Sequence, residues 1–319
     1  MGSGASLPNV RLPSDTVVVV TGGNTGIGYE LAKGLAIMGA HVIIACRSEQ
    51  RATEAIAKMK AEFLSETSHL GLSHSDEREL QLEYMHLDLA ILKSAMDFIT
   101  SFKQAGRKLH ILLCNAGIGS PPWGHTEDGY ETQFQVNYLG HFLIIAHLLP
   151  IMQQSGEDCR IILTSSVASQ YGTFDLDTIQ AKDERVYKRC MYYSKSKLYQ
   201  VMQTITMASR LSGSHVTMTC YHPGVVATEI TRSMEDHSCI CLFGLFKCCL
   251  KTPEQGAKTG IYLAVSPEVK GQSGGYYVNC RQKTPSRTAS FLPRNETYQK
   301  QLWDYTVDCL KDLLPADFS

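Results

Sequence analysis

The 319 residues include 30 Lys and Arg against 31 Asp and Glu, so the net charge at neutral pH is -1. This near balance excludes the strongly basic surface that a nucleic-acid-binding protein uses, and we expect a small ligand instead. The hydrophobic fraction of 44% is ordinary for a folded globular chain and excludes disorder over most of its length.

Short apolar runs alternate with longer stretches of helical periodicity from residue 16 to residue 278, which is typical of βαβ units. We predict strands at 16–21, 41–46, 82–86, 109–114, 160–164, 216–221 and 276–278, with helices at 25–38 and about 297–313. Because the strands are continuous runs of Val, Ile and Leu, both faces of the sheet should be covered. The predicted fold class is therefore α/β, a Rossmann doubly wound parallel sheet flanked by helices in a single domain.

No repeat or change of composition marks an internal domain boundary. We assign residues 1–15 to an N-terminal tail, residues 16–280 to a dinucleotide-binding catalytic domain, and residues 281–319 to a C-terminal extension. Residues 64–79 turn polar and break both periodicities, which predicts a surface insertion. Residues 234–250 are too apolar for a solvated loop and too short to span a bilayer. They predict either a packed helix or, near residues 229–250, a lid over a lipophilic pocket that contacts a membrane surface.

The sequence contains 11 cysteines, an odd number that cannot all pair within one chain. We expect a reducing compartment and buried free thiols. Cys239, Cys241, Cys248 and Cys249 lack the spacing typical of zinc sites, so no metal site is expected.

We find no signal-peptide pattern and no run of about 18 apolar residues, which predicts a cytoplasmic protein without a transmembrane helix. Gly2 fits the N-myristoylation pattern, as an expression-tag scar also would, so membrane association stays open.

A glycine-rich turn, Thr21-Gly22-Gly23-Asn24-Thr25-Gly26-Ile27-Gly28, follows the first predicted strand and leads directly into a helix. Such a turn lets a pyrophosphate approach the free N–H groups at a helix N-terminus, where the helix dipole favours negative charge. A Cβ at these glycines would obstruct the turn, the phosphate or the packing of helix on strand. A turn that binds nothing is the alternative to the dinucleotide site that we predict at Gly22, Asn24, Gly26, Ile27 and Gly28.

The tip of the second predicted strand reads Ala45-Cys46-Arg47-Ser48. An NAD site places a carboxylate there to accept the ribose hydroxyls, and this chain has none. The Arg47 guanidinium would instead attract a 2'-phosphate, so we predict NADP(H) in preference to NAD(H), with contacts from Arg47 and Ser48. An Arg47 that merely caps the helix starting at Ser48 is the alternative.

Tyr193 and Lys197 are four residues apart at the start of a predicted helix and therefore share a face. A nearby ammonium and a positive nicotinamide favour the phenolate and would lower the pKa of Tyr193. The pair could then donate or accept a proton near neutral pH. Taken alone, this spacing is common in surface pairs.

Over residues 16–278 the chain resembles the short-chain dehydrogenase/reductase family. Six motifs occur in family order: residues 21–28, Asp88-Leu89, Asn115-Ala116-Gly117, Ser165-Ser166, Tyr193-x-x-x-Lys197 and Pro223-Gly224-Val225-Val226-x-Thr228. The resemblance implies that Ser166 hydrogen-bonds the substrate oxygen, Tyr193 exchanges the proton and Lys197 holds the nicotinamide ribose. It also implies that Asn137 supports a proton relay through water. Ser165 is the alternative to Ser166.

The same resemblance implies further contacts with the cofactor. It places Asp88 and Leu89 beside the adenine, the Asn115, Ala116 and Gly117 segment along the cofactor, and Pro223, Gly224, Val226 and Thr228 toward the carboxamide.

Residues 24–28, 45–47 and 137–142 look like the retinol dehydrogenase branch of this family, whose members act on retinoids, polyprenoids and other lipophilic aldehydes and alcohols. This implies an NADP(H)-dependent oxidoreductase with a small lipophilic substrate. Peripheral membrane contact is left open. A homo-oligomer is also left open, because helices of this fold commonly pair. The alternative is a cofactor-binding scaffold or redox sensor with little turnover. A serine hydrolase built on Ser166 is excluded because no Gly-x-Ser-x-Gly elbow is present.

Overall fold

The computed structural model describes residues 10–69, 79–226, 250–283, 292–316 and 318. Its centre is an eight-stranded sheet in the order β3-β2-β1-β4-β5-β6-β7-β8. All neighbouring strands are parallel except β7 and β8. The strands are β1 (Val17–Thr21), β2 (His41–Cys46), β3 (Leu82–His86), β4 (Ile111–Cys114), β5 (Cys159–Thr164), β6 (Val216–His222), β7 (Tyr276–Val278) and β8 (Arg281–Gln282).

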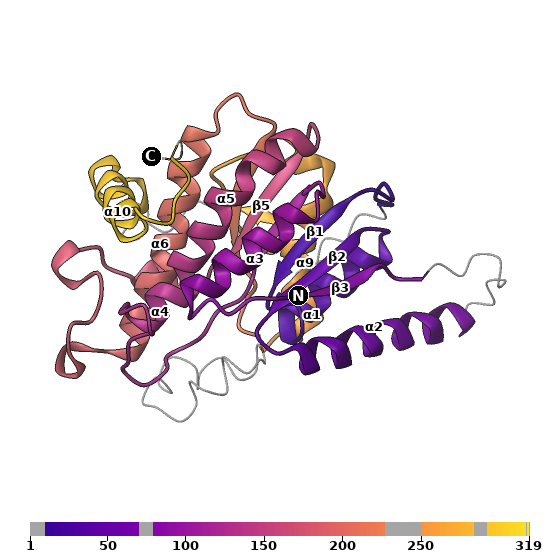
Figure 1. The fold of residues 1–319 in the computed structure, drawn as a ribbon, viewed down its shortest axis with the longest axis horizontal. Coiled ribbons are helices and arrows are strands. Elements are labelled where there is room, and N and C mark those ends of the chain that lie inside the picture. The colour runs from indigo at the N-terminus through magenta and orange to yellow at the C-terminus, as the bar shows by residue number, and fades with distance from the viewer. Residues whose placement is uncertain (1–9, 70–78, 227–249, 284–291, 317, 319) are drawn as a thin grey trace.

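Helices cover both faces of this sheet, which confirms the predicted doubly wound α/β fold (Figure 1). One face packs against α3 (Leu92–Gln104), α5 (Gly140–Ser155) and α6 (Arg189–Arg210). The other packs against α1 (Gly26–Ile37), α2 (Glu49–His69) and α9 (Pro253–Val265). The seven predicted strands are confirmed to within two residues at each end. The pairing of β8 with β7 was not predicted, because two exposed residues carry no alternating pattern.

The predicted surface insertion at residues 64–79 is wrong over its first six residues, because α2 continues to His69. An exposed helix end tolerates polar residues, so the change in composition at Leu64 did not mark a change in structure. Residues 70–78 lie outside the described part of the chain.

A single continuous helix runs through α4 (Thr132–Phe134), a π-helical turn η2 (Gln135–Leu139) and α5. Among the described residues, this stretch, Thr132–Ser155, has the length and composition of a membrane span, and an 18-residue window of it has a mean hydropathy of 1.3. Of that window, 83% is buried within the protein, and the core helix of a globular domain has the same properties. The π-helical turn is notable because such turns interrupt the regular backbone hydrogen bonds and occur often at functional sites.

The C-terminal residues complete the face formed by α5 and α6. Helix α10 (Glu296–Cys309) lies beside α6 (Figure 1), and Leu302 and Trp303 belong to the same buried cluster as α5. The ring of Trp303 meets Phe142 of α5 with 5.1 Å between centroids, and Thr306 hydrogen-bonds the Tyr138 hydroxyl at 2.8 Å. Residues 292–310 therefore contribute to the core of the domain.

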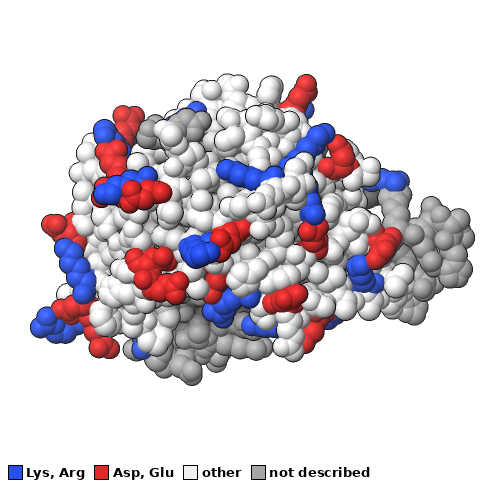
Figure 2. Space-filling model, in the orientation of Figure 1, with Lys and Arg blue, Asp and Glu red and all other residues white. Residues whose placement is uncertain are grey.

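Charged side chains of both signs are interspersed over the face of the molecule in Figure 2. This face shows no extended patch of a single sign.

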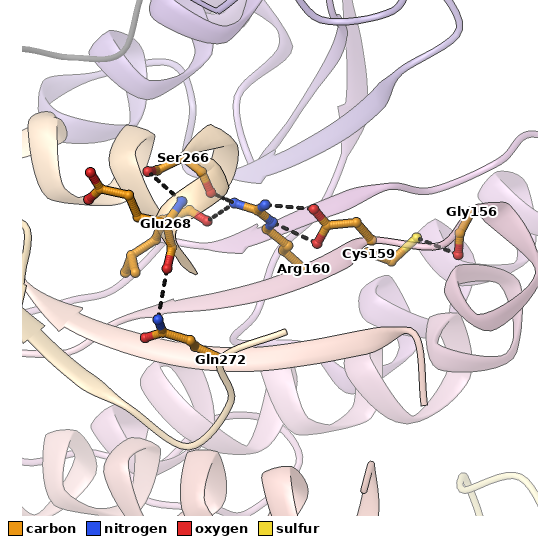
Figure 3. A network of polar contacts seen from close by, with 8 residues as sticks. Gly156, Cys159, Arg160, Ser266, Glu268 and Gln272 are labelled. Atoms are coloured by element: carbon orange, nitrogen blue, oxygen red, sulfur yellow. Dashed lines mark hydrogen bonds and ion pairs between the residues drawn. The ribbon is translucent and has the colours of Figure 1, made fainter. Parts of the chain in front are cut away.

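Buried Arg160 joins β5 to the end of α9 (Figure 3). Its Nη1 donates to the carbonyl oxygens of Leu263 and Ser266 at 3.0 and 2.9 Å. Its Nε and Nη2 donate to the carboxylate of Asp158 at 2.9 and 2.6 Å. The last carbonyls of a helix lack intrahelical partners and carry partial negative charge, so a guanidinium stabilises this helix end. Arg160 thereby attaches α9 to the sheet.

We predict that Arg160→Met lowers the free energy of unfolding by about 2–4 kcal/mol, because two carbonyls and a carboxylate lose their shared donor. Urea unfolding measures the loss. Lys108→Met is the control, because its ion pair with Asp15 is exposed and such pairs add little. The assignment of Arg160 as an anchor would be wrong if both variants lost the same stability.

Candidate active site

A cavity of about 660 Å³ opens at the carboxyl ends of the parallel strands. This is the place where open α/β sheets bind ligands. Predicted cofactor residues from separate segments meet in its wall: Gly22, Asn24, Gly26, Ile27, Gly28, Arg47, Ser48, Asp88, Leu89, Asn115, Ala116, Gly117, Pro223, Gly224 and Val226. Ser166, Tyr193 and Lys197 also line it, whereas Asn137 is fully buried behind it. Thr228, residues 229–249 of the lid predicted near 229–250, and Cys239, Cys241, Cys248 and Cys249 lie outside the described residues.

The glycine turn has the shape that a pyrophosphate requires. Gly22 and Gly26 adopt φ values of 66° and 55°, a region in which glycine is favoured. A Cβ on Gly28 would lie 2.1 Å from the carbonyl oxygen of Gly22, so this position requires glycine. Thr25 precedes α1 without making a side-chain cap, and the first turn of α1 has no acidic residue. The first N–H groups of α1 are therefore open to an anionic ligand.

The junction of β2 and α2 presents two arginines to the cavity. Arg47 is exposed at the tip of β2, and Arg51 lies one helical turn further on, also in the cavity wall. The Ser48 hydroxyl accepts the backbone N–H of Arg51 at 3.3 Å, so Ser48 caps this helix and Arg47 does not. Our sequence reasoning missed Arg51, although its four-residue spacing from Arg47 on a predicted helix was a usable signal.

Thr21, at the end of β1, connects the cofactor end of the cavity to the catalytic end. Its buried hydroxyl accepts the backbone N–H groups of Asn115 and Ala116, both at 2.9 Å. It also meets Nε2 of His141 at 3.0 Å, and Nδ1 of His141 lies 3.3 Å from the main-chain oxygen of Asn137. Burial lowers the pKa of His141 to about 4, so the ring is neutral: Nδ1–H donates to Asn137 and Nε2 accepts from Thr21. Sequence reasoning named neither Thr21 nor His141 as a site residue.

The part of the cavity that contains the predicted catalytic residues combines the turn after β5 with the start of α6. A hydrogen bond between Ser166 and Tyr193 joins their side chains. The Ser165 hydroxyl is buried and donates to the main-chain oxygen of Lys197 at 2.9 Å. Both serines line the cavity, but the Ser166 hydroxyl bonds Tyr193, whereas the Ser165 hydroxyl is bonded to the main chain of α6.

Burial is the largest influence on the pKa of Tyr193 in the cofactor-free protein. Burial raises it to about 12, and the hydrogen bond with Ser166 opposes this rise. Burial also lowers the pKa of Lys197, to about 7, because it disfavours the charged ammonium. Its Nζ lies 5.7 Å from the centre of the Tyr193 ring. Burial therefore disfavours both the phenolate form of Tyr193 and the ammonium form of Lys197.

Asn137 is held from several sides within the π-helical turn. Its Oδ1 accepts the N–H of Ile118 at 2.8 Å, and its Nδ2 donates to the Ile118 carbonyl at 3.0 Å and to the Ser196 hydroxyl at 2.9 Å. A Cβ on Gly117 would lie 3.0 Å from Oδ1 of Asn137 and 3.5 Å from Nζ of Lys197. Asn137 thus fixes the segment after β4 close to the ammonium.

Apolar side chains form part of the wall beside Ser166 and Tyr193. They include Ile118, Val136, Val167 and Met191. Cys190 also lines the cavity there and is disulfide-bonded. The expectation that every cysteine is a buried free thiol is therefore wrong for Cys190, which lies at the cavity edge and not in the core. Six described cysteines are free: Cys46, Cys114, Cys159, Cys220, Cys280 and Cys309. Among the described residues, no group of three His, Cys, Asp or Glu side chains could hold a metal ion.

Comparisons with known proteins match this geometry. The model of the short chain dehydrogenase family matches residues 16–238. Human retinol dehydrogenase 14 is 37% identical over 293 residues, which cover 90% of this chain and 84% of that protein. Human polyprenol dehydrogenase is 35% identical over 299 residues, covering 92% and 84%. The crystal structure of an uncharacterized protein from Mycobacterium Paratuberculosis has a TM-score of 0.71 at 26% identity, covering 97% of each chain.

We predict that Thr21→Val lowers the free energy of unfolding by about 1–3 kcal/mol, because two buried N–H groups and His141 lose their partner. Affinity for a dinucleotide should fall as well, since Asn115 and Ala116 line the cavity. Thr21→Ser keeps the hydroxyl and is the matched control. Thermal melts and fluorescence titration with NADPH measure the two effects. A Val variant as stable as the Ser variant would contradict the role given to the hydroxyl.

Proposed function

Because the chain belongs to the short-chain dehydrogenase family, in its retinol dehydrogenase branch, we propose that it is an NADP(H)-dependent oxidoreductase that interconverts a lipophilic alcohol and its aldehyde or ketone. The observation that carries this proposal is the meeting of Ser166, Tyr193 and Lys197 in one cavity with the glycine turn. A scaffold without turnover would not need all of these groups around one cavity.

The reaction divides between the cofactor and the side chains. When bound, the nicotinamide supplies or accepts the hydride. Ser166 and Tyr193 orient the substrate oxygen by hydrogen bonds, and the Tyr193 hydroxyl gives that oxygen its proton during reduction. A phenol with a pKa near 12 holds its proton at neutral pH, which suits this donor role. During oxidation the transfer runs in reverse, and Tyr193 must first lose its proton. A charged Lys197 and a positive nicotinamide both assist that loss.

The residues present fit a pyrophosphate and a 2'-phosphorylated ribose. The uncapped N-terminus of α1 and the close packing of Gly28 against Gly22 provide the first site. Arg47 and Arg51 provide two positive groups for the second. The described lining includes one carboxylate, Asp88, which follows β3 rather than β2. A 2'-phosphate therefore meets attraction at the tip of β2, and we infer a preference for NADP(H).

A lipophilic substrate fits the apolar wall beside Tyr193. The similar human proteins are named for retinol and polyprenol. Both are lipids that partition into bilayers, so we propose a cytoplasmic protein with peripheral membrane contact. Purified protein with NADPH and a panel of retinal, polyprenal, steroid and simple aldehydes tests the substrate class. Faster turnover of the simple aldehydes than of every lipophilic one would contradict it.

We predict that Tyr193→Phe lowers turnover by at least about 100-fold, the low end for loss of a general acid, while the Kd for NADPH changes only a few-fold. Phenylalanine keeps the ring and removes the hydroxyl group together with the proton that it would transfer. Steady-state rates and fluorescence titration measure the two quantities. Near-normal turnover would remove Tyr193 from the catalytic role.

We also predict that Arg47→Ala weakens NADPH binding by about 1.5–3 kcal/mol, the range for hydrogen bonds to charged groups, with little effect on NADH. Arg51→Ala should weaken NADPH binding in the same direction, because both arginines line the cavity at the junction of β2 and α2. Lys93→Ala on α3 is the control, since this exposed lysine is absent from the described cavity wall. Equal losses for NADPH and NADH would identify the arginines as structural.

A further inference from the structure

The side chain of Gln200 lies between the Lys197 ammonium and the main chain of Asn137. Gln200 is one helical turn after Lys197 on α6 and is fully buried. Its Oε1 accepts from Nζ of Lys197 at 3.3 Å, and its Nε2 donates to the main-chain oxygen of Asn137 at 2.7 Å. An ammonium can only donate and a carbonyl can only accept, so these partners fix the orientation of the amide. Gln200 is therefore a rigid bridge between α6 and the π-helical turn.

This bridge restricts the directions in which the N–H donors of the Lys197 ammonium point. Lys197 has three N–H donors. One goes to the carbonyl oxygen of Thr164 at 2.9 Å, and one goes to Gln200. Lys197 also lines the cavity, so its third donor is available to a ligand there. With Thr164 and Gln200 holding two positions, rotation about the terminal bond of the side chain is restricted and the third donor keeps one direction.

The Gln200 amide also affects whether protons can pass through the main-chain oxygen of Asn137. The family resemblance implied a relay in which Asn137 passes protons through water. Here the main-chain oxygen of Asn137 meets the Gln200 amide and the neutral ring of His141. A water molecule can accept one proton while giving up another, whereas an amide donor would first have to become an anion. Gln200 therefore holds a hydrogen bond in this position without passing on a proton.

We propose that Gln200 is a positioning residue whose amide takes the place of solvent between Lys197 and Asn137 and holds the ammonium with one donor directed into the cavity. The use of that donor for a nicotinamide ribose rests on the proposed function, whereas the contacts of Gln200 do not. The proton that Tyr193 gives to a substrate oxygen is then returned by water from the cavity side, where Tyr193 is half-buried.

The chain contains a matched control three residues further along the same helix. Gln203 is also buried, and neither its Oε1 nor its Nε2 has a hydrogen-bond partner among the described residues. The same substitution at Gln200 and Gln203 therefore changes the same chemical group in the same helix, with and without the bridge to Lys197.

The first experiment measures the pKa of Lys197 by NMR in cofactor-free protein labelled with 13C at the lysine side chains, with the signal assigned by Lys197→Arg. Tyr193 on α6 and His141 on α5 are the titratable groups that the described structure places near Lys197. Their pKa values of about 12 and 4 lie outside the neutral range, so a titration observed near neutral pH belongs to Lys197. Gln200→Glu should raise the pKa of Lys197 by at least about one unit, because an adjacent opposite charge favours the ammonium. Gln203→Glu should produce a clearly smaller change.

The second experiment compares Gln200→Leu with Gln203→Leu in steady-state kinetics, after thermal melts have established that both are folded. Gln200→Leu should lower kcat about tenfold or more with little change in KM for the carbonyl substrate, since orientation of the ammonium is lost and the substrate contacts are kept. Gln203→Leu should keep kcat within about twofold. If Gln200→Leu does not fold, Gln200→Glu and its NMR titration decide.

Equal pKa shifts in the two Glu variants, or no shift in a folded Gln200→Glu, would overturn the contact between Gln200 and Lys197. A shifted pKa with unchanged kcat in Gln200→Leu would overturn the positioning role. Absence of turnover in the unaltered protein with every alcohol and aldehyde would instead refute the proposed function, and the NMR result would stand by itself.

Discussion

The buried hydroxyl of Thr21 is the contact on which both ends of the cavity depend. A strand end leaves the next backbone N–H groups without partners, and inside a protein such groups are costly unless they are hydrogen-bonded. Thr21 accepts two of them from the segment after β4 and reaches the helix through His141. The same oxygen therefore supports the cavity wall at Asn115 and Ala116 and, through His141, the main chain of Asn137 in the π-helical turn. A small side chain at the end of β1 connects three elements that are far apart in the sequence.

A second constraint is the burial of Lys197. Removing an ammonium from water is unfavourable, and its lowered pKa expresses that cost. The protein offsets part of the cost with neutral acceptors, the Thr164 carbonyl and the Gln200 amide, and uses no carboxylate among the described neighbours. A carboxylate would stabilise the ammonium more, but it would also hold the proton more tightly and neutralise the field that a substrate or cofactor meets. Neutral acceptors leave the charge of Lys197 effective toward the cavity.

The rest of the fold serves to hold these few groups still. The π-helical turn lies near the N-terminal end of a long buried helix, and its Tyr138 contacts Thr306 of α10. Arg160 fastens α9 at the opposite end of the sheet, and α9 packs against α1, whose N-terminus faces the cavity. Asn137 has several hydrogen-bond partners in the π-helical turn, where the backbone departs from regular helix. A functional site needs such support, because its side chains must be held in a fixed geometry.

The sequence by itself determined the order of strands and helices, the glycine turn, the positive strand tip at Arg47 and the pairing of Tyr193 with Lys197. Each of these depends on residues within one turn or one strand, where spacing alone decides which side chains share a face. Only the tertiary structure gave the hydroxyls of Ser165 and Ser166 different partners, brought Thr21 to His141 across 120 residues, and placed Gln200 against Asn137 across 63. It also brought α10 into the core and lowered the pKa of Lys197. Burial and contact between distant segments arise from how helices pack on the sheet, and no local pattern in the chain records that packing.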